Sequence, residues 1–465
     1  MIEFILNNNP IKTDHPSGAL LLDFIRYEQS LMGTKIGCRE GDCGACTVLI
    51  GDLINGKLNY KQVTSCLTPL GNAQGKHVVT IEGLNMDSLS PVQQFMVDES
   101  GSQCGFCTTG FVVSLTQFCL ANATPSYKDA IASIDGNICR CTGYKPIERA
   151  AKHITESLSG KNLNETLEWL IEQKFIPSYF DQISSMLNTI LPVDNVPQNE
   201  TLVGGGTDLY VQKHDQLIDQ NIDFISNMPY LNFIEIDNGV CTVGAGATAT
   251  DLLESEVFIS GFPRLKDYLK LFASSPIRNM ATLGGNIVNA SPIGDFTSFF
   301  LALNSKIKLT KKDKSRSIYL KEFYKGYKDL DKSPDEIVST ISFKLPTQDS
   351  HFNFEKVSKR IYLDIASVNT ALQISISANK IAETHLSAGG VGPTPIYLIN
   401  TCSFLSGKTL TPETVRSANE ILQDEISPIS DVRGSSDYKR LLLRQLFYAH
   451  FIKLFPSQIT LESLK

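Results

Sequence analysis

Several features that would assign the chain to a membrane, secreted or nucleic-acid-binding class are missing from its sequence. No apolar run approaches the roughly 18 residues that a membrane-spanning helix needs. The N-terminus, from Met1 to Leu6, has neither the basic lead nor the cleavage site of a signal peptide. The formal net charge is −7 and lysine and arginine form no long run, which argues against nucleic-acid binding. We therefore expect a cytoplasmic protein with no membrane and no nucleic-acid partner.

The residue constellations of common catalytic sites are missing as well. None of the seven histidines has the spacing of a metal ligand, and no Ser/His/Asp or paired-carboxylate grouping stands out. The sequence also contains no internal repeat and no low-complexity segment. The chain therefore offers no identifiable catalytic side chain, and its chemistry must depend on another residue type.

Cysteine is that residue type. The chain has eleven cysteines, and eight of them fall into two groups that end at Cys141. In a reducing compartment, grouped cysteines indicate metal ligation rather than disulfides. The other three, Cys119, Cys241 and Cys402, are flanked by apolar or strand-like sequence, and we expect them to be buried structural thiols.

The first group has the spacing C-x4-C-x2-C followed by a distant fourth cysteine. Its members are Cys38, Cys43, Cys46 and Cys66. This is the plant-type pattern of a [2Fe–2S] cluster, and the nearby glycines Gly37, Gly41 and Gly44 let backbone N–H groups approach the sulfurs. A structural zinc site fits poorly, because zinc prefers C-x-x-C pairs in both halves.

The second group combines a C-x-x-C pair with a C-x-C pair. Its members are Cys104, Cys107, Cys139 and Cys141. Spacing alone favours zinc here, because structural zinc sites are common. The neighbouring iron–sulfur site reverses that preference, since an electron that reaches it needs somewhere to go.

The insert between the two pairs of the second group predicts a small helical bundle. Phe111, Leu115 and Phe118 share one helix face, and Ser126 begins a capping pattern for a second helix. Pro146 is expected near the start of a third helix. Residues 158–174 are polar and rich in charge, and we interpret them as a linker, partly helical.

Two glycine-rich segments follow. In the first, from Thr201 to Tyr210, a strand runs through a glycine triplet into a helix, a corner at which backbone N–H groups can hold a diphosphate. An ordinary turn explains this segment equally well, and it is not the G-x-G-x-x-G fingerprint. The second, from Ile277 to Asp295, again places small residues where backbone must approach closely. Together they favour a nucleotide-type cofactor over two structural turns.

The remaining chain alternates strand and helix patterns. A basic run at 308–316 indicates a solvated hairpin tip, and 320–345 is strand-like. Further strands are expected at 354–360, 363–371 and 381–391, and helices at 179–190, 412–423 and 437–454. Thr411 is the expected N-cap of the helix that begins at Pro412.

These motifs together resemble the iron–sulfur/flavin small subunits of bacterial xanthine dehydrogenases, in the molybdenum hydroxylase family. The resemblance is carried by Gly37–Val48 with Cys66, Gln103–Thr108, Gly136–Tyr144, Leu202–Leu209, Thr282–Asn286, Ser291–Asp295 and Phe354–Ala366. It implies a multidomain α+β chain. The expected parts are a β-grasp ferredoxin-like [2Fe–2S] domain (1–85), a helical [2Fe–2S] domain (86–157), the linker (158–174), an FAD-binding domain of the vanillyl-alcohol-oxidase type (175–347) and a small α+β C-terminal flavoprotein domain (348–465).

The resemblance also implies ligands by matched position. Both cysteine groups would hold [2Fe–2S] clusters, the second one against the preference from spacing alone. The FAD diphosphate would be wrapped by Leu202, Val203, Gly204, Gly205, Gly206, Thr207, Asp208 and Leu209. The rest of the FAD site would consist of Phe272, Thr282, Leu283, Gly284, Gly285, Asn286, Asp295, Val338 and Lys356.

The implied function is an electron relay. A separate molybdopterin-bearing large chain would hydroxylate hypoxanthine or xanthine, and electrons would pass through the two clusters to FAD and on to NAD. The implied assembly is a heterotetramer of two small and two large chains. Two positions depart from the family pattern: Arg39 stands where a small residue is usual, and Thr109 where proline is common.

Three alternatives remain at the level of sequence. The chain would serve another molybdenum hydroxylase, acting on an aldehyde, nicotinate or another N-heterocycle. Alternatively, it is a stand-alone NADH-dependent flavin diaphorase. A non-enzymatic alternative is a zinc-bearing interaction scaffold whose glycines form ordinary turns.

Overall fold

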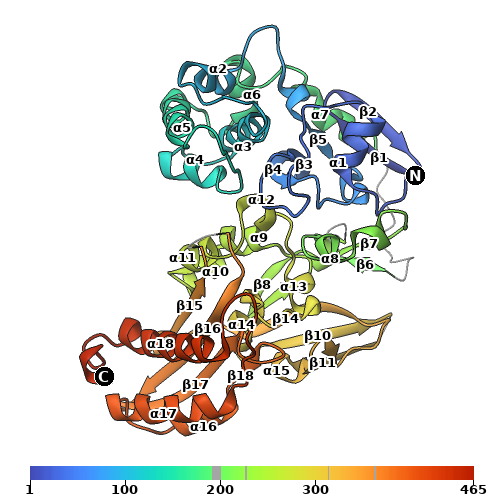
Figure 1. The fold of residues 1–465 in the computed structure, drawn as a ribbon. Coiled ribbons are helices and arrows are strands. Elements are labelled where there is room, and N and C mark those ends of the chain that lie inside the picture. Colours follow the sequence, from blue (N-terminus) through green and yellow to red (C-terminus); the bar gives the residue numbers. More distant parts are fainter. Residues whose placement is uncertain (191–200, 226–227, 313, 361–362) are drawn as a thin grey trace. The chain divides into compact units, whose positions relative to one another are not determined.

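The chain folds into two compact units in the computed structural model, which describes residues 1–190, 201–225, 228–312, 314–360 and 363–465. Unit 1 comprises Met1–Asn227 and Ser274–Ala281, and unit 2 comprises Met228–Ala273 and Thr282–Lys465 (Figure 1). Each unit has its own hydrophobic cores and is described by itself.

Unit 1 begins with a mixed five-stranded sheet in the order β2-β1-β5-β3-β4. Its strands are β1 (Ile2–Leu6), β2 (Asn9–Thr13), β3 (Thr47–Ile54), β4 (Lys57–Thr64) and β5 (His77–Val79). β1 and β5 run parallel, and the other neighbours are antiparallel. The short helix α1 (Leu21–Asp23) continues as a π-helical turn (Phe24–Glu28), and its apolar side chains share one core with Cys46 and Cys66. This is the predicted ferredoxin-like domain.

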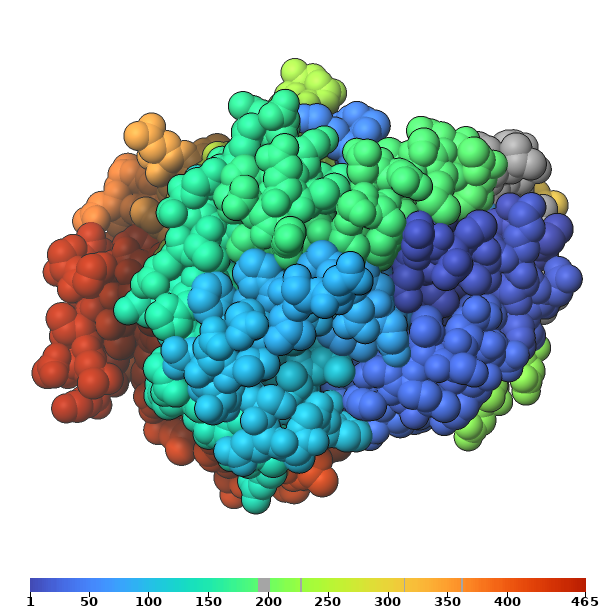
Figure 2. Space-filling view, turned by 90° about the horizontal axis from the view of Figure 1, so that it is seen from above, coloured from blue at the N-terminus to red at the C-terminus, as the bar shows by residue number. Residues whose placement is uncertain are grey.

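Helices follow this sheet within unit 1. They are α2 (Pro91–Asp98), α3 (Thr108–Leu120), α4 (Tyr127–Ser133), α5 (Lys145–Ser157), α6 (Thr166–Glu172) and α7 (Phe180–Leu187). The predicted face of α3 is confirmed, since Phe111, Leu115 and Phe118 are buried together. Ser126 caps α4 by accepting from the N–H of Asp129, as predicted. Figure 2 shows this helical part beside the ferredoxin-like domain, and α3 contacts β3 and β4.

Residues 158–174 contain α6, whose Leu170 is fully buried in the core of the helical part. The helix predicted at 179–190 is confirmed as α7. Later segments of unit 1 are β6 (Leu202–Val203), α8 (Leu209–Leu217), β7 (Asp223–Phe224) and α12 (Ser275–Arg278). β6 and β7 form a two-stranded parallel sheet.

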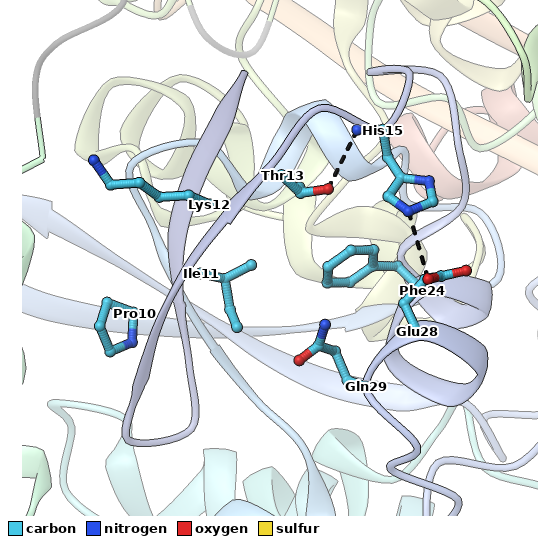
Figure 3. A pocket seen from close by; sticks show the side chains of 8 residues that line it. All are labelled: Pro10, Ile11, Lys12, Thr13, His15, Phe24, Glu28 and Gln29. Atoms are coloured by element: carbon cyan, nitrogen blue, oxygen red, sulfur yellow. Dashed lines mark hydrogen bonds and ion pairs between the residues drawn. The ribbon is translucent and has the colours of Figure 1, made fainter.

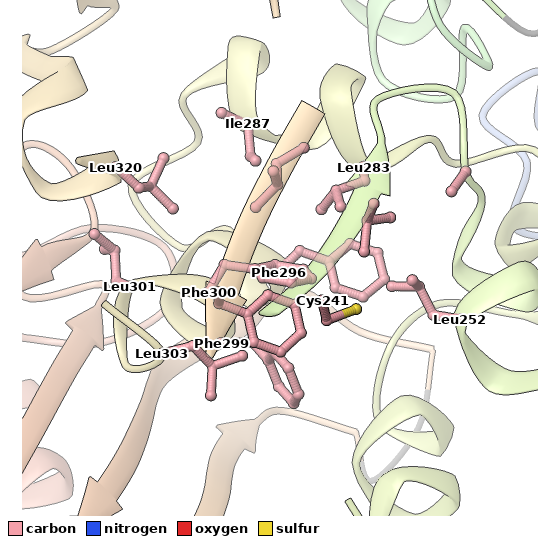
Figure 4. Close-up of a cluster of buried hydrophobic side chains, with 14 of the residues drawn as sticks. Cys241, Leu252, Leu283, Ile287, Phe296, Phe299, Phe300, Leu301, Leu303 and Leu320 are labelled. Atoms are coloured by element: carbon pink, nitrogen blue, oxygen red, sulfur yellow. The ribbon is translucent and has the colours of Figure 1, made fainter. Parts of the chain in front are cut away.

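Unit 2 contains a five-stranded sheet in the order β11-β10-β14-β9-β8. Its strands are β8 (Ile234–Asp237), β9 (Val240–Gly244), β10 (Lys306–Lys311), β11 (Lys314–Tyr319) and β14 (Ile337–Lys344). The helices of this part are α9 (Ala249–Glu254), α10 (Glu256–Gly261), α11 (Leu265–Lys270), α13 (Leu283–Asn289), α14 (Asp295–Leu301) and α15 (Leu320–Phe323). A small ladder pairs β12 (Tyr324–Gly326) with β13 (Asp329–Leu330). Phenylalanines of α14 fill the core beneath the sheet (Figure 4).

The C-terminal part of unit 2 is an antiparallel sheet in the order β15-β16-β17-β18, packed against helices. Its elements are β15 (Ser350–Ser358), β16 (Ala366–Ser377), β17 (Lys380–Gly389), β18 (Ile396–Tyr397), α16 (Ile399–Leu405), α17 (Pro412–Glu425) and α18 (Ser436–Leu454). Thr411 caps α17 as predicted, and α18 packs on β15 and β16. The three predicted strands and both predicted helices of this part are confirmed, and α16 was not predicted.

The fold class, a multidomain α+β chain, is confirmed, and one local prediction is wrong. Residues 320–345 do not begin as a strand, because Leu320 starts α15, which Glu322 stabilises by accepting from the N–H of Tyr319. The basic run at 308–316 contains the turn of the β10–β11 hairpin and the strand ends beside it, and most of its described side chains are exposed, so the predicted solvated hairpin tip is confirmed. In the described part of the chain, every helix falls short of the length and apolar character that crossing a bilayer requires.

Candidate functional site

The first thiol set, Cys38, Cys43, Cys46 and Cys66, is assembled at one end of the ferredoxin-like domain. The Cys38 thiol lies beside the thiols of Cys43 and Cys66, and the Cys66 thiol also lies beside that of Cys46. Interaction with Cys43 and Cys66 lowers the pKa of the Cys38 thiol far below its usual value, whereas interaction with Cys38 raises the pKa of Cys43. Cys46 and Cys66 are buried, whereas Cys38 and Cys43 are half-buried.

The loop that carries Cys38 and Cys43 turns sharply. Gly41 and Gly44 have φ angles of +78° and +67°. Arg39, which lies between Gly37 and Gly41 in the sequence, has a φ of +56°. A left-handed backbone aims successive N–H groups inward, and the N–H of Glu40 donates to the Cys38 sulfur at 3.3 Å. The predicted role of the glycines is confirmed for all three, because Gly41 and Gly44 have a conformation that favours glycine and a Cβ on Gly37 would lie 2.6 Å from the Cys43 sulfur.

The second thiol set lies at the surface of the helical part. The sulfurs of Cys104 and Cys141 are 3.6 Å apart and both residues are exposed. Cys107, the residue before α3, hydrogen-bonds to Cys139; burial, together with this bond, raises the pKa of Cys107 to about 12. The N–H of Thr142 donates to the Cys139 sulfur at 3.4 Å.

In the first set Cys38 lies beside Cys43 and Cys66, and Cys66 beside Cys46, whereas the sulfurs of the second set meet as the pairs Cys104–Cys141 and Cys107–Cys139. Within the described ranges, no group of three or more His, Cys, Asp or Glu side chains has the geometry of ligands around one ion. A tetrahedral zinc needs four ligands around a single point, whereas a [2Fe–2S] cluster takes two ligands at each of two irons. In both sets a backbone N–H donates to a sulfur, which suits the charged thiolates of a [2Fe–2S] cluster.

A short hydrogen-bonded link joins the loops of the two sets. The N–H of Ile138 donates to the carbonyl oxygen of Cys43 at 3.0 Å, and Asn137 Nδ2 donates to the Gly44 oxygen at 3.1 Å. Ser114 on α3 donates to Asn137 Oδ1 at 2.8 Å. Cys43 belongs to the first set, and Ile138 is bonded directly to Cys139 of the second. Sequence patterns missed Asn137 and Ser114, because a buried side-chain hydrogen bond leaves no periodic signal.

The predicted diphosphate loop, 202–209, lies in unit 1 as a strand, a glycine turn and the start of α8. Gly206 has a φ of +77°, and a Cβ on Gly205 would lie 1.6 Å from the carbonyl oxygen of Met280. Within the residues that the structure covers, the N–H groups of Gly205, Gly206 and Thr207 donate to no protein acceptor. A strand–turn–helix corner with free N–H donors suits an anion such as a diphosphate.

This loop also approaches the first thiol set within unit 1. A Cβ on Gly206 would lie 3.1 Å from the carbonyl oxygen of Leu67, the residue after Cys66. The φ of +77° favours glycine at this point, and a side chain there would be tight against the backbone next to a thiol ligand.

The second glycine-rich segment differs from the predicted loop. Thr282 caps α13, so Leu283, Gly284, Gly285 and Asn286 form the first turn of a helix. The N–H groups of Leu283 and Gly284 donate to Ala247 and Ala245 at 2.9 and 2.8 Å. A Cβ on Gly284 would lie 2.8 Å from Ala245 Cβ, so this glycine allows the helix to approach the strand end. Within the predicted glycine-rich segment 277–295, residues 283–286 thus begin a helix rather than a loop, because the Thr282 side chain accepts from the N–H of Gly285, and the predicted close approach of backbone is confirmed at Gly284.

Three other predicted residues of unit 2 converge. Lys356 Nζ lies 2.6 Å from Asp295 Oδ2 and 2.7 Å from the carbonyl oxygen of Leu271, and its side chain is 2% exposed. Phe272 follows Leu271, and its ring lies 4.5 Å from that of Phe296, next to Asp295. Val338 is buried on β14, paired with Leu309.

Asn369 is a further member of this group that sequence patterns missed. Its Nδ2 donates to Asp295 Oδ1 at 2.6 Å, and its Oδ1 accepts from Ser298 at 2.7 Å. The residue is fully buried on β16. β16 contains several other polar residues, so Asn369 gave no distinct signal in the sequence.

A hollow of about 300 Å³ lies on the outer side of the ferredoxin-like domain, between β2 and the π-helical turn (Figure 3). His15 is one of the residues that line it. The backbone N–H of His15 donates to the Thr13 side chain, and a ring nitrogen of His15 lies close to the Glu28 carboxylate. None of the predicted site residues lines this hollow.

Three of the predicted cysteines, Cys119, Cys241 and Cys402, take no part in these groups and are buried, which confirms them as structural thiols. Burial raises the pKa of each to about 12, which keeps them as uncharged thiols.

Four domain families match the chain in order. A 2Fe-2S iron-sulfur cluster binding domain matches residues 4–71 and a [2Fe-2S] binding domain residues 80–152. The FAD binding domain in molybdopterin dehydrogenase matches residues 172–347, and the CO dehydrogenase flavoprotein C-terminal domain residues 353–454.

Known proteins agree with this order. Xanthine dehydrogenase of Emericella nidulans is 29% identical over 97% of this chain and 38% of its own length, and aldehyde oxidase 1 of Bos taurus is 28% identical over 94% and 38%. The chain thus spans about two fifths of the curated relatives that it matches.

A solved structure, quinoline 2-oxidoreductase of Pseudomonas putida 86, covers 56% of this chain and 90% of its own, with a TM-score of 0.51 and 22% identity. That likeness shows a shared fold. The four domain families in this order place the chain in the molybdenum hydroxylase family, as a protein that carries its iron–sulfur and FAD-binding domains.

Proposed function

We propose that this chain is the electron-transfer small subunit of a xanthine dehydrogenase. A separate molybdopterin-bearing chain hydroxylates hypoxanthine or xanthine, and electrons enter this chain at the second thiol set. They pass to the first set, then to FAD, and finally to NAD. When bound, the clusters and the flavin supply the redox chemistry, and the residues of this chain hold them and connect them.

The carrying observation is the continuous connection within unit 1. The second thiol set is exposed through Cys104 and Cys141, which suits entry of electrons from another protein. The Ile138–Cys43 hydrogen bond joins it to the first set, and Leu67 brings that set against the Gly206 turn. One hydrogen bond and one close backbone approach thus connect the exposed second set, the first set and the diphosphate loop.

The surface around the second set supports a partner chain. Phe106, Ile138 and Tyr144, which flank its cysteines, are 46%, 42% and 39% exposed. Exposed aromatic and aliphatic side chains gathered around exposed ligands are typical of a protein interface. We propose that the molybdopterin-bearing chain covers this face, in a heterotetramer of two small and two large chains.

In unit 2 the proposed flavin contacts are Phe272, Asp295 and Lys356, joined by Val338 and the first turn of α13. Lys356 and Asp295 hold each other in place, so a cofactor that approaches finds a fixed cation and a fixed carboxylate. The proposal assigns the diphosphate to 202–209, where free N–H groups are available.

A second candidate differs only in the partner's substrate. Aldehyde oxidase 1 matches nearly as well as xanthine dehydrogenase, at 28% against 29% identity, so an aldehyde or N-heterocycle hydroxylase remains a candidate. A stand-alone diaphorase is the third.

The test is an analysis of iron, sulfide, zinc and flavin, together with a visible spectrum, on the purified chain. Four irons, four sulfides and one FAD per chain support the relay, since two [2Fe–2S] clusters and a flavin require them. Two irons per chain would show that the second thiol set holds no cluster and takes no part in the relay. Bound zinc without flavin would support the zinc-bearing interaction scaffold instead.

Substrate and acceptor need the whole complex. The proposal expects the holoenzyme to reduce NAD with xanthine and not with aldehydes. If this chain oxidised NADH by itself and no partner chain purified with the native protein, it would instead be a diaphorase.

A further inference from the structure

Arg39 is unusual in the loop of the first thiol set, because it is a large residue in a left-handed conformation, with a φ of +56°. A residue with a side chain is strained there, whereas glycine is not. Something must hold this backbone conformation in place.

The Arg39 side chain provides that hold. Its two terminal nitrogens lie 3.0 and 2.7 Å from the two carboxylate oxygens of Asp23, the last residue of α1. This bidentate geometry is the strongest arrangement for an arginine–carboxylate pair. Each side chain is about one third exposed, at 35% and 32%, so the pair is at the edge of the site rather than in the core.

α1 is tied to the other side of the same site. The N–H groups of Leu21 and Leu22 donate to Thr68 and Ser65 at 2.9 and 3.2 Å, and these two acceptors flank Cys66. Asp23 therefore connects the Cys66 segment, through α1, with the segment that carries Cys38 and Cys43.

We propose that the Arg39–Asp23 pair is a positioning element of the first thiol set, which holds Cys38 and Cys43 against Cys66 and balances charge beside a [2Fe–2S] cluster. This inference rests on the proposed function. It adds that the reduction potential of this cluster depends on two residues that bind no metal.

The two members of the pair have opposite expected effects on the potential. Asp23→Asn leaves the arginine cation uncompensated next to Cys38, which favours the reduced, more negative cluster and raises the potential. Arg39→Ala leaves the carboxylate alone and lowers it. Combining the two substitutions is expected to return the potential toward the wild-type value.

Arg39→Gly separates backbone from charge. Glycine adopts the left-handed conformation without strain, so this variant keeps the loop shape while it removes the cation. It is expected to lower the potential as Arg39→Ala does, but to retain iron better. Arg39→Lys keeps the charge and loses the bidentate geometry, so it should affect iron retention more than potential.

The experiment is an EPR-monitored redox titration of the full-length holoprotein, with iron loss to a chelator followed in parallel. The second cluster is the internal reference, since its potential should not move. Arg39→Ala is expected to lose iron from the first cluster about fivefold faster, the factor that corresponds to about 1 kcal/mol of an exposed ion pair. Lys12→Ala, which breaks the Lys12–Glu3 pair on the same domain at 3.1 Å, is the matched control and should change neither quantity.

The proposal is overturned if Asp23→Asn and Arg39→Gly leave the potential of the first cluster unchanged while the wild type shows both clusters. A wild type with no cluster at all would instead reject the proposed function, so the two failures are distinct. If Arg39→Ala cannot assemble the cluster, Asp23→Asn and Arg39→Lys still decide the result.

Discussion

The ion pair of Lys356 and Asp295 is buried within unit 2. The lysine is 2% exposed and the aspartate 13%, so neither charge is compensated by water. Removing one partner of a buried pair typically costs about 3–5 kcal/mol. We expect Lys356→Met to lower the free energy of unfolding by about 3 kcal/mol, measured by chemical denaturation of the flavin-free chain.

Controls separate charge from packing. The double variant Asp295→Asn/Lys356→Met removes both charges and should recover part of the loss. Lys325→Met, at an exposed ion pair of the same unit, should behave as the wild type. Equal losses in the single and the double variant would show that packing alone matters at this position.

His450 predicts a pH dependence of stability. It is fully buried on α18, hydrogen-bonded to Asn353 at 2.7 Å, and burial lowers its pKa from 6.5 to about 3. The unfolded chain therefore binds a proton between these values that the folded chain does not, so stability is complete above pH 6.5 and falls as the pH drops toward 3. The slope from this one group reaches at most about 1.4 kcal/mol per pH unit.

The measurement is the thermal midpoint of His450→Gln between pH 4.5 and 7.5. The variant should be less stable at pH 7 and show a shallower decline toward acid than the wild type. The decline should not vanish, because burial also lowers the pKa of His77 in unit 1 to about 4. His351→Gln serves as control, and an unchanged slope in His450→Gln would refute the assignment.

Residues differ in how far their sequence context predicted them. The eight grouped cysteines were predicted as two sets because thiolate ligands need fixed spacings, and the structure brings each set together. The roles of Asn369 and His450 were not predicted, because they depend on hydrogen-bond partners that are distant in the sequence, Asp295 and Asn353.

At the scale of elements, two physical effects oppose each other where α3 contacts the loop that carries Cys38 and Cys43. Replacing Gly110 in α3 by alanine favours the helix by about 1 kcal/mol. A Cβ there would, however, lie 2.2 Å from the carbonyl oxygen of Gly44, a backbone atom that cannot swing away. Overpacking of this kind costs about 1–3 kcal/mol, so we expect Gly110→Ala to destabilise the chain.

The same substitution should separate the two loops, because Gly44 also accepts from Asn137. Electron transfer between the clusters, followed by stopped-flow after reduction of one of them, should slow. Gly160→Ala is the matched control, since no atom lies within 4 Å of its added Cβ, and it should be neutral or slightly stabilising. A stable Gly110→Ala protein with wild-type transfer would show that the close approach is not needed.

Capping signals predicted elements well, whereas glycine was ambiguous. Ser126 and Thr411 each accept the N–H three residues ahead, and α4 and α17 begin there as predicted. At 282–286 the glycines suggested a loop, but they serve a close contact between α13 and Ala245. Glycine thus marks a close approach, and does not tell whether a ligand or another part of the protein makes it.

For the whole molecule, the order of the units does not follow the sequence at segment 274–281. This segment belongs to unit 1, although the residues before and after it belong to unit 2. Arg278 pairs with Asp135 at 2.7 Å, and Asn279 donates to the carbonyl oxygen of Gln62 at 2.8 Å. These partners are 143 and 217 positions away, so local patterns could not predict them.

The two thiol sets differ in exposure across unit 1, and this difference predicts the order in which iron is lost. Cys104 and Cys141 are exposed, whereas Cys46 and Cys66 are buried. Oxidants and chelators reach exposed thiolate ligands first. We expect iron to leave in two phases, with the EPR signal of the second set disappearing in the faster one.

Two variants assign the phases. Cys66→Ser should abolish the slow phase, and Cys104→Ser the fast one. Binding of the proposed molybdopterin-bearing chain should slow the fast phase alone, because only the second set has exposed Phe106 and Tyr144 around it for a partner to cover. If the EPR signal of the first set disappeared before that of the second set, the first cluster would be the more accessible one. Because the first set is the one connected to the diphosphate loop, this result would contradict the assignment of the second set as the point of electron entry.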